Sequence, residues 1–103
     1  MPSRIEMLRG FAAQRPEDPF PHYGLAMEYK NAGDLAAAWE TFKELLDRHA
    51  DYVAAYLHAG NTLVALGRQA EARQVYERGM AACVRKGDSH AHGELAGALA
   101  QLG

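Results

Sequence analysis

The sequence predicts an all-α protein of about six helices. Alanine, the strongest helix former, occurs 20 times in 103 residues, whereas the β-branched residues that favour strands occur only seven times. Apolar residues recur every three or four positions along most of the chain, which is the spacing of one helix face. Gly33, Gly67 and Gly87 separate these segments, as expected of residues that follow helix ends. Together these observations leave no segment for a β-sheet.

The first two helices are marked by start and stop signals. Ser3 and Glu6 form an S-x-x-E capping box, and the apolar pattern that follows stops before Pro16, which predicts a helix over about residues 3–15. The stretch PEDPFP then forms a turn. A second helix follows, with Leu25 and Tyr29 on its apolar stripe, and ends within residues 31–33.

Four further helices complete the chain. Asp34 caps a third helix, and apolar residues at helical spacing predict a fourth from about residue 53 to 66. The fifth extends from residue 69 to about 85, and the sixth from 89 to 102 with Asp88 or Ser89 as its cap. Short turns join all six helices.

Composition excludes several classes of function. With 11 basic and 13 acidic residues the chain is nearly neutral, so we expect no binding to nucleic acid or to an anionic membrane surface. No apolar stretch is long enough for a membrane span, and no secretory signal is visible, so a cytoplasmic protein is expected. Cys83 is the only cysteine, which rules out a disulfide within the chain.

The chain resembles itself at a fixed period. At a shift of 34 residues Ala26 aligns with Gly60, Ala38 with Ala72, and Phe42 with Tyr76, and a shift of 36 carries the pattern into the last helix. Small residues meet small ones because two helices of a hairpin cross there at short distance. Each hairpin leaves an apolar face that only the next repeat can cover.

These residues resemble the tetratricopeptide repeat family, whose pattern is W-x2-L-G-x2-Y, then A-x3-F, then P. The first copy matches with Leu25-Ala26-x2-Tyr29 and Ala38-x3-Phe42, although His22 replaces the tryptophan. The second copy matches with Ala59-Gly60-x2-Leu63 and Ala72-x3-Tyr76. The resemblance implies a short right-handed α-solenoid in a single domain. Residues 1–17 would form a half-repeat helix, 19–52 and 53–86 two repeats, and 88–103 a capping helix. The residues expected to pack the repeats are Leu25, Ala26, Tyr29, Ala38, Phe42, Gly60, Leu63, Ala72 and Tyr76.

The sequence gives no positive signal for an enzyme, a metal site or a cofactor. His90 and His92 lie two residues apart, which places them on different faces of a helix. Cys83 is most simply a small apolar core residue, because no positioned base accompanies it. Trp39 follows the small Ala38 and is expected to pack against the next repeat, with a role in partner binding as the alternative.

In proteins of this family the first helices of successive repeats line a concave groove that holds an extended peptide or a helix. The resemblance therefore implies a non-catalytic protein-interaction module. The groove residues carried over from it are Phe20, Tyr23, Met27, Lys30, Leu57, His58 and Asn61. We expect a mostly apolar or aromatic ligand segment and no preference for acidic chain ends, because residues such as Tyr23 and Met27 replace the charged clamp of the chaperone-binding members. The alternative is a self-association unit, a homodimer paired through Leu95, Leu99 and Leu102 of the last helix.

Overall fold

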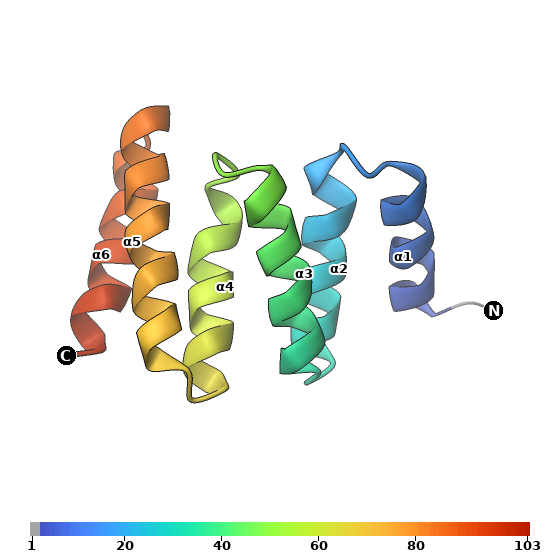
Figure 1. Ribbon diagram of the computed structural model, residues 1–103, viewed down its shortest axis with the longest axis horizontal. Helices are drawn as coiled ribbons and strands as arrows, with labels where there is room; N and C mark the ends of the chain where they lie inside the picture. The colour runs from blue at the N-terminus through green and yellow to red at the C-terminus, as the bar shows by residue number, and fades with distance from the viewer. Residues whose placement is uncertain (1–2) are drawn as a thin grey trace.

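The computed structural model describes residues 3–103, and these residues form six α-helices (Figure 1). Helix α1 spans Arg4–Gln14, α2 Pro19–Asn31, α3 Leu35–Arg48, α4 Ala54–Ala65, α5 Gln69–Lys86 and α6 Ser89–Gln101. The described range contains no strand, so the all-α prediction is confirmed. Helix ends lie within two residues of those expected from the sequence.

The helices form an elongated stack with principal extents of 44, 29 and 19 Å, and the chain ends lie at opposite ends of the long axis (Figure 1). Each helix packs against the next one in the chain, and α4 also contacts α2 and α6. Helices α2, α4 and α6 therefore form one layer, and α1, α3 and α5 pack onto it. We call the surface that this first layer presents the α2–α4–α6 face.

The turns inside the two helical pairs share one backbone geometry, 34 residues apart. Gly33 and Gly67 have φ values of 84° and 78°, a left-handed conformation that glycine adopts without a steric penalty. After the first turn, the Asp34 carboxylate accepts a hydrogen bond of 3.1 Å from a backbone N–H of α3. The matching Arg68 offers no acceptor and instead pairs with Glu71 at 2.7 Å. The second turn thus keeps the backbone of the first without its side-chain cap.

The core lies where paired helices cross. A Cβ at position 60 would lie 2.6 Å from Cδ1 of the Tyr76 ring, so the absence of a side chain at Gly60 lets α4 and α5 approach closely. Gly79 of α5 meets Tyr56 of α4 in the same way. Most of the residues expected to pack the repeats are buried, whereas Tyr29 is half-buried; the buried ones are Leu25, Ala26, Ala38, Phe42, Gly60, Leu63, Ala72 and Tyr76.

Three other side chains discussed from the sequence are also buried. Trp39 is 5% exposed and Cys83 is 1% exposed, so both belong to the core. Leu95 was expected to lie on an uncovered edge of the last helix, but it is 1% exposed and packs against Gly79. This part of the prediction is wrong because α6 turns Leu95 toward α5. Leu99 and Leu102 are half-buried.

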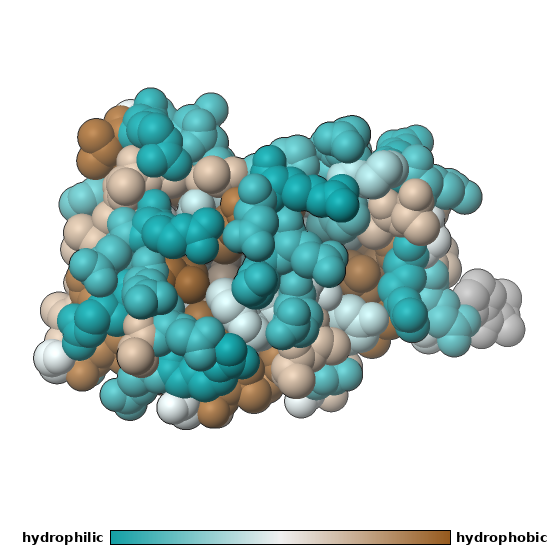
Figure 2. Space-filling model, viewed as in Figure 1, coloured by the Kyte–Doolittle hydropathy of each residue, from teal (hydrophilic) through white to brown (hydrophobic). Residues whose placement is uncertain are grey.

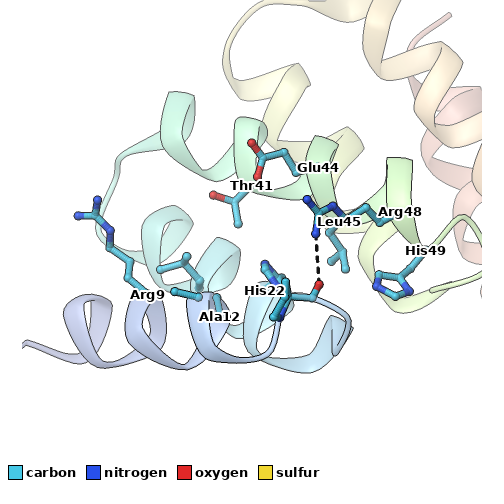
Figure 3. Close-up of a pocket in the computed structure, with 11 residues that line it drawn as sticks. Arg9, Ala12, His22, Thr41, Glu44, Leu45, Arg48 and His49 are labelled. Atoms are coloured by element: carbon cyan, nitrogen blue, oxygen red, sulfur yellow. Dashed lines mark hydrogen bonds between the residues drawn. The ribbon is translucent and has the colours of Figure 1, made fainter.

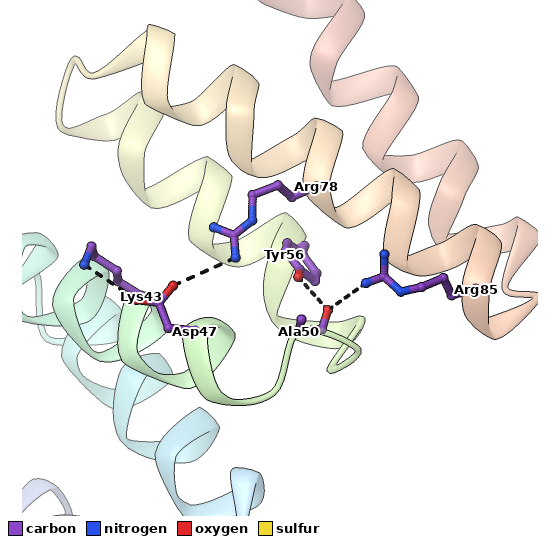
Figure 4. A network of polar contacts seen from close by, with 6 residues as sticks. All are labelled: Lys43, Asp47, Ala50, Tyr56, Arg78 and Arg85. Carbon is purple, nitrogen blue, oxygen red and sulfur yellow. Dashed lines mark hydrogen bonds and ion pairs between the residues drawn. The ribbon is translucent and has the colours of Figure 1, made fainter.

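Polar contacts tie the second helical pair to the end of α3 (Figure 4). The Tyr56 hydroxyl donates to the Ala50 carbonyl at 2.6 Å, and Arg85 of α5 pairs with Asp51 at 2.7 Å. Arg78 lies 3.9 Å from Asp47 of α3. The arginine contacts are exposed and stabilise the fold only slightly, but the Tyr56 bond fixes a buried ring against the turn between the repeats.

The face shown in Figure 2, where α3 and α5 lie nearest the viewer, carries mainly hydrophilic residues with apolar ones visible between the helices. None of the helices in residues 3–103 combines the length and the apolar character needed to cross a membrane.

Candidate functional site

Six of the seven predicted groove residues lie along the α2–α4–α6 face, on two neighbouring helices. Asn61 is exposed, whereas Met27, Lys30 and Leu57 are half-buried. Tyr23 and His58 are also half-buried and contact each other through their rings, with centroids 6.2 Å apart. The face therefore offers a mixture of apolar area and polar atoms.

Tyr23 is part of an aromatic cluster that joins α2 to its neighbours. Its ring centroid lies 6.5 Å from that of Phe42 and 5.5 Å from that of Tyr52, in edge and tilted arrangements that favour aromatic pairs. Burial raises the pKa of the Tyr23 hydroxyl above its ordinary value. Tyr23 thus supports the packing between repeats as well as lining the face.

Lys30 and His58 meet across the α2–α4 boundary. The Lys30 Nζ lies 3.4 Å from the His58 Nδ1, a contact between residues 28 positions apart in the chain. Burial of the imidazole and the nearby Lys30 charge both lower the pKa of His58, and Glu94 of α6 opposes this shift. Glu94 in turn lies 3.5 Å from His90, one turn away on the same helix.

Asn61 is held by a hydrogen bond from the core. The buried Tyr76 hydroxyl donates to the Asn61 Oδ1 at 2.6 Å, which fixes the orientation of the amide. The amide nitrogen remains available on an exposed residue. The sequence singled out Asn61 from its register alone, and its partner Tyr76 becomes visible only in the fold.

Phe20 does not join the other predicted groove residues. It is 71% exposed and lines a cleft of about 390 Å³ together with Met7 and Phe11 of α1. This surface, which we call the α1 cleft, also contains Arg4, which pairs with Glu28 of α2 at 2.6 Å. Phe20 lies in the first turn of α2, where α1 is its neighbour, and the repeat register alone does not show this neighbouring helix.

A second cleft, of about 330 Å³, lies between α1 and α3 and is also lined by residues of α2 (Figure 3). His22 and His49 line it, and the Nε2 atom of each is buried without a hydrogen-bond partner in the described structure. Arg48 donates a long hydrogen bond of 3.4 Å to the Pro16 carbonyl across the cleft. This cleft was not predicted from the sequence, where the one signal for it is His22 in place of the tryptophan of the tetratricopeptide pattern.

No group of three or more histidine, cysteine, aspartate or glutamate side chains in residues 3–103 is arranged to hold a metal ion. Among the predicted groove residues on the α2–α4–α6 face, the nitrogen-bearing side chains are a lysine, a histidine and an asparagine. Such groups can bind a ligand through hydrogen bonds and charge.

Paired antiparallel helices stacked at a regular period define an α-helical repeat protein, a short α-solenoid. Comparison with known proteins specifies the family. A tetratricopeptide repeat family model matches residues 29–82. A TPR repeat-containing protein of Pseudomonas aeruginosa is 31% identical over 98 residues, covering 95% of this chain and 93% of its own. The chain therefore belongs to the tetratricopeptide repeat family.

Solved structures agree with this assignment. The solution structure of a tetratricopeptide repeat domain protein from Salinibacter ruber superposes with a TM-score of 0.79 at 32% identity, covering 84% of this chain and 88% of that one. A protein from Bordetella parapertussis superposes with a TM-score of 0.81 at 30% identity, covering 99% of this chain and 89% of that one. Both similarities support the helical-repeat fold.

We expect the free energy of unfolding to fall as the pH is lowered from 7 to 5, partly because of His58. The folded state holds the pKa of His58 below its ordinary value of 6.5, so the unfolded chain binds more protons in this range. Well above pH 6.5 His58 is neutral in both the folded and the unfolded chain and does not change the free energy of unfolding. As the pH falls below this value, the unfolded chain takes up the proton first, and the free energy of unfolding decreases. Urea unfolding at both pH values should show a smaller loss for His58→Gln than for the parent protein. Equal losses would contradict the assigned environment of His58.

Proposed function

We propose that the protein is a non-catalytic interaction module that binds an extended peptide or a helix on the α2–α4–α6 face. The tetratricopeptide repeat fold generally mediates protein–protein interaction. The observation that carries the proposal is the placement of half-buried Met27 and Leu57 beside the polar atoms of Lys30, His58 and Asn61. Apolar area supplies binding energy, and oriented polar groups supply specificity. A cytoplasmic location remains a prediction from the sequence.

Peptide binding can be mapped by nuclear magnetic resonance. We expect an array of acetylated, amidated peptides to yield binders that shift the amide signals of α2 and α4. Met27→Ala and Asn61→Ala should each weaken such a binder by about tenfold, which corresponds to about 1.4 kcal/mol. Lys43→Ala, which removes an exposed side chain of α3, is the matched control and should leave binding unchanged.

Two results would reject the α2–α4–α6 face as the binding site. The first is that the shifted signals map to the α1 cleft or to the cleft lined by His22 and His49. The second is that both variants keep the parent thermal transition and the parent affinity. Either outcome would leave the repeat fold intact and move the site elsewhere.

Self-association through α6 is the alternative function. Because Leu95 is buried, such pairing would have to use Leu99 and Leu102. Light scattering separates the two functions, since a protein that remains a monomer at micromolar concentration does not act mainly as a homodimer.

A further inference from the structure

Most of the exposed large apolar side chains gather at the α1 cleft. Met7, Phe11 and Phe20 line it, and each of them is at least 49% exposed. One comparable side chain is found elsewhere in residues 3–103, that of Val84 on α5. The cleft volume of about 390 Å³ lies within the range of about 300–1,000 Å³ that is usual for ligand pockets. An apolar patch of this kind marks an interaction site.

The connection between α1 and α2 repeats the backbone geometry of the connection between α3 and α4. Arg15, which follows α1, and His49, which follows α3, both have a φ of −131°, with ψ values of 65° and 71°. The Asp18 N–H donates to the Arg15 carbonyl at 3.1 Å, and the Tyr52 N–H donates to the His49 carbonyl at 3.0 Å. The α1 cleft therefore has a counterpart one repeat further along the chain, beside α3 and the turn that follows it.

An aromatic side chain from α2 fills that counterpart. The Tyr23 ring centroid lies 6.5 Å from that of Phe42 and 5.5 Å from that of Tyr52. At the shift of 34 residues Phe42 matches Leu8 and Tyr52 matches Asp18, and both of these residues line the α1 cleft. The cleft thus corresponds to a site for an aromatic residue on a helix that is antiparallel to α1, as α2 is to α3 (Figure 1).

The lining of the α1 cleft selects the kind of aromatic residue. Leu8 and Asp18 have smaller side chains than Phe42 and Tyr52, so the α1 cleft leaves room for a ring system larger than a phenol. The Asp18 carboxylate accepts a hydrogen bond of 3.0 Å from the Phe20 N–H, and it can accept a further one. An indole ring combines a large apolar body with one N–H donor.

We propose that the α1 cleft binds an amphipathic helix of a partner protein through a tryptophan side chain of that helix. The indole ring packs against Phe11 and Phe20, and its N–H donates to the Asp18 carboxylate. The cleft is separate from the α2–α4–α6 face, so this inference adds a second binding site and does not depend on the proposed function.

The charged side chains of the α1 cleft do not favour a strongly charged partner. Arg4 pairs with Glu28 of α2 at 2.6 Å. Arg15 and Asp18, which carry opposite charges, both line the cleft. Recognition therefore depends on apolar area and on the hydrogen bond to Asp18.

A second copy of this chain does not offer the required side chain on its last helix. The residues that match Tyr23 at the repeat shifts of 34 and 36 are Leu57 in α4 and Gly93 in α6. Docking of α6 in the manner of α2 would place Gly93 at the α1 cleft and leave the apolar lining uncovered. We therefore assign the cleft to a different protein.

The experiment uses a peptide with blocked ends that a lactam bridge holds in a helix. Its sequence contains alanine, leucine, lysine and glutamate around one central tryptophan, and two analogues carry phenylalanine or alanine at that position. Isothermal titration calorimetry with the full chain should show about tenfold tighter binding of the tryptophan peptide than of the phenylalanine analogue. The alanine analogue should not bind measurably. In nuclear magnetic resonance spectra the tryptophan peptide should shift the amide signals of α1 and of the start of α2.

Three variants test the assigned residues, and thermal unfolding shows that each remains folded. Phe20→Ala should weaken the tryptophan peptide by about tenfold or more. Asp18→Asn keeps an N-cap for α2 but removes the carboxylate. It should reduce the affinity of the tryptophan peptide to that of the phenylalanine analogue and leave the analogue unchanged. Val84→Ala removes an equally exposed apolar side chain outside the cleft and should change no affinity.

Several results would overturn this inference while leaving the proposed function intact. One is that the tryptophan peptide does not bind, or that it shifts the signals of the α2–α4–α6 face instead of those of α1. Another is equal affinity for tryptophan and phenylalanine peptides, in the parent and in Asp18→Asn. A third is that Val84→Ala weakens binding as much as Phe20→Ala, because the contact would then be non-specific. A parent dimer that Phe20→Ala converts to a monomer in light scattering would assign the cleft to a second copy.

Discussion

Replacement of Phe42 with alanine should lower the free energy of unfolding by about 3–5 kcal/mol. The Phe42 side chain of α3 is 0% exposed and lies beside the Tyr23 ring of α2. Its truncation removes a ring from water-free surroundings and leaves a cavity that the stacked helices cannot close. A domain of this size has a total stability of roughly 5–15 kcal/mol, so the variant should be close to unfolding.

Phe20→Ala is the matched control for Phe42→Ala. The same ring is removed, but Phe20 is 71% exposed at the start of α2, so its loss should change the stability by less than about 0.5 kcal/mol. Urea unfolding followed by far-ultraviolet circular dichroism measures both changes. Similar unfolding midpoints for the two variants would show that Phe42 does not lie in the principal core.

Much of the fold could be predicted because the repeat encodes packing directly. Gly60 stands at the register of Ala26, and Tyr76 at that of Phe42, so the sequence indicates where helices approach closely and which ring fills the space. The structure places Gly60 against the Tyr76 ring. Turn positions were equally predictable, since Gly33 and Gly67 both require left-handed backbone geometry.

The surface could be predicted less well, because exposure depends on the neighbouring helices. The register assigned Phe20 and Tyr23 to one groove, but the structure places Phe20 in the α1 cleft and packs Tyr23 against Phe42 and Tyr52. Helical periodicity identifies the direction in which a side chain leaves its own helix. The curvature and spacing of adjacent helices decide whether another helix covers it.

Contacts between residues that are far apart in the chain could not be predicted from the sequence for a related reason. Lys30 and His58 lie 28 residues apart, and neither forms a recognisable motif alone. The same is true of His22 and His49, which line one cleft although His22 belongs to α2 and His49 directly follows α3. Their shared environment arises from the hairpin, so the chemistry of both places becomes apparent only after the helices are stacked.

Gly79→Ala should destabilise the protein by an amount at or above the upper end of the range of about 1–3 kcal/mol that is usual for overpacked cores. An added Cβ would lie 2.6 Å from the Tyr56 Cβ and 2.9 Å from the Leu95 Cδ1. The Tyr56 Cβ is attached directly to the backbone of α4, and the ring is fixed by the hydrogen bond to Ala50. Relief of the overlap therefore requires α4 to move away from α5, whereas the end of the Leu95 side chain can rotate.

Gly97→Ala makes the same substitution in α6, at a position where the added Cβ meets no atom within 4 Å. It should stabilise the protein by about 0.5–1 kcal/mol, since alanine loses less conformational freedom than glycine in a helix. Thermal and urea unfolding should therefore shift in opposite directions for the two variants. Because the chemical change is identical, a stabilising effect of Gly79→Ala would mean that α4, α5 and α6 do not approach as closely as the structure places them.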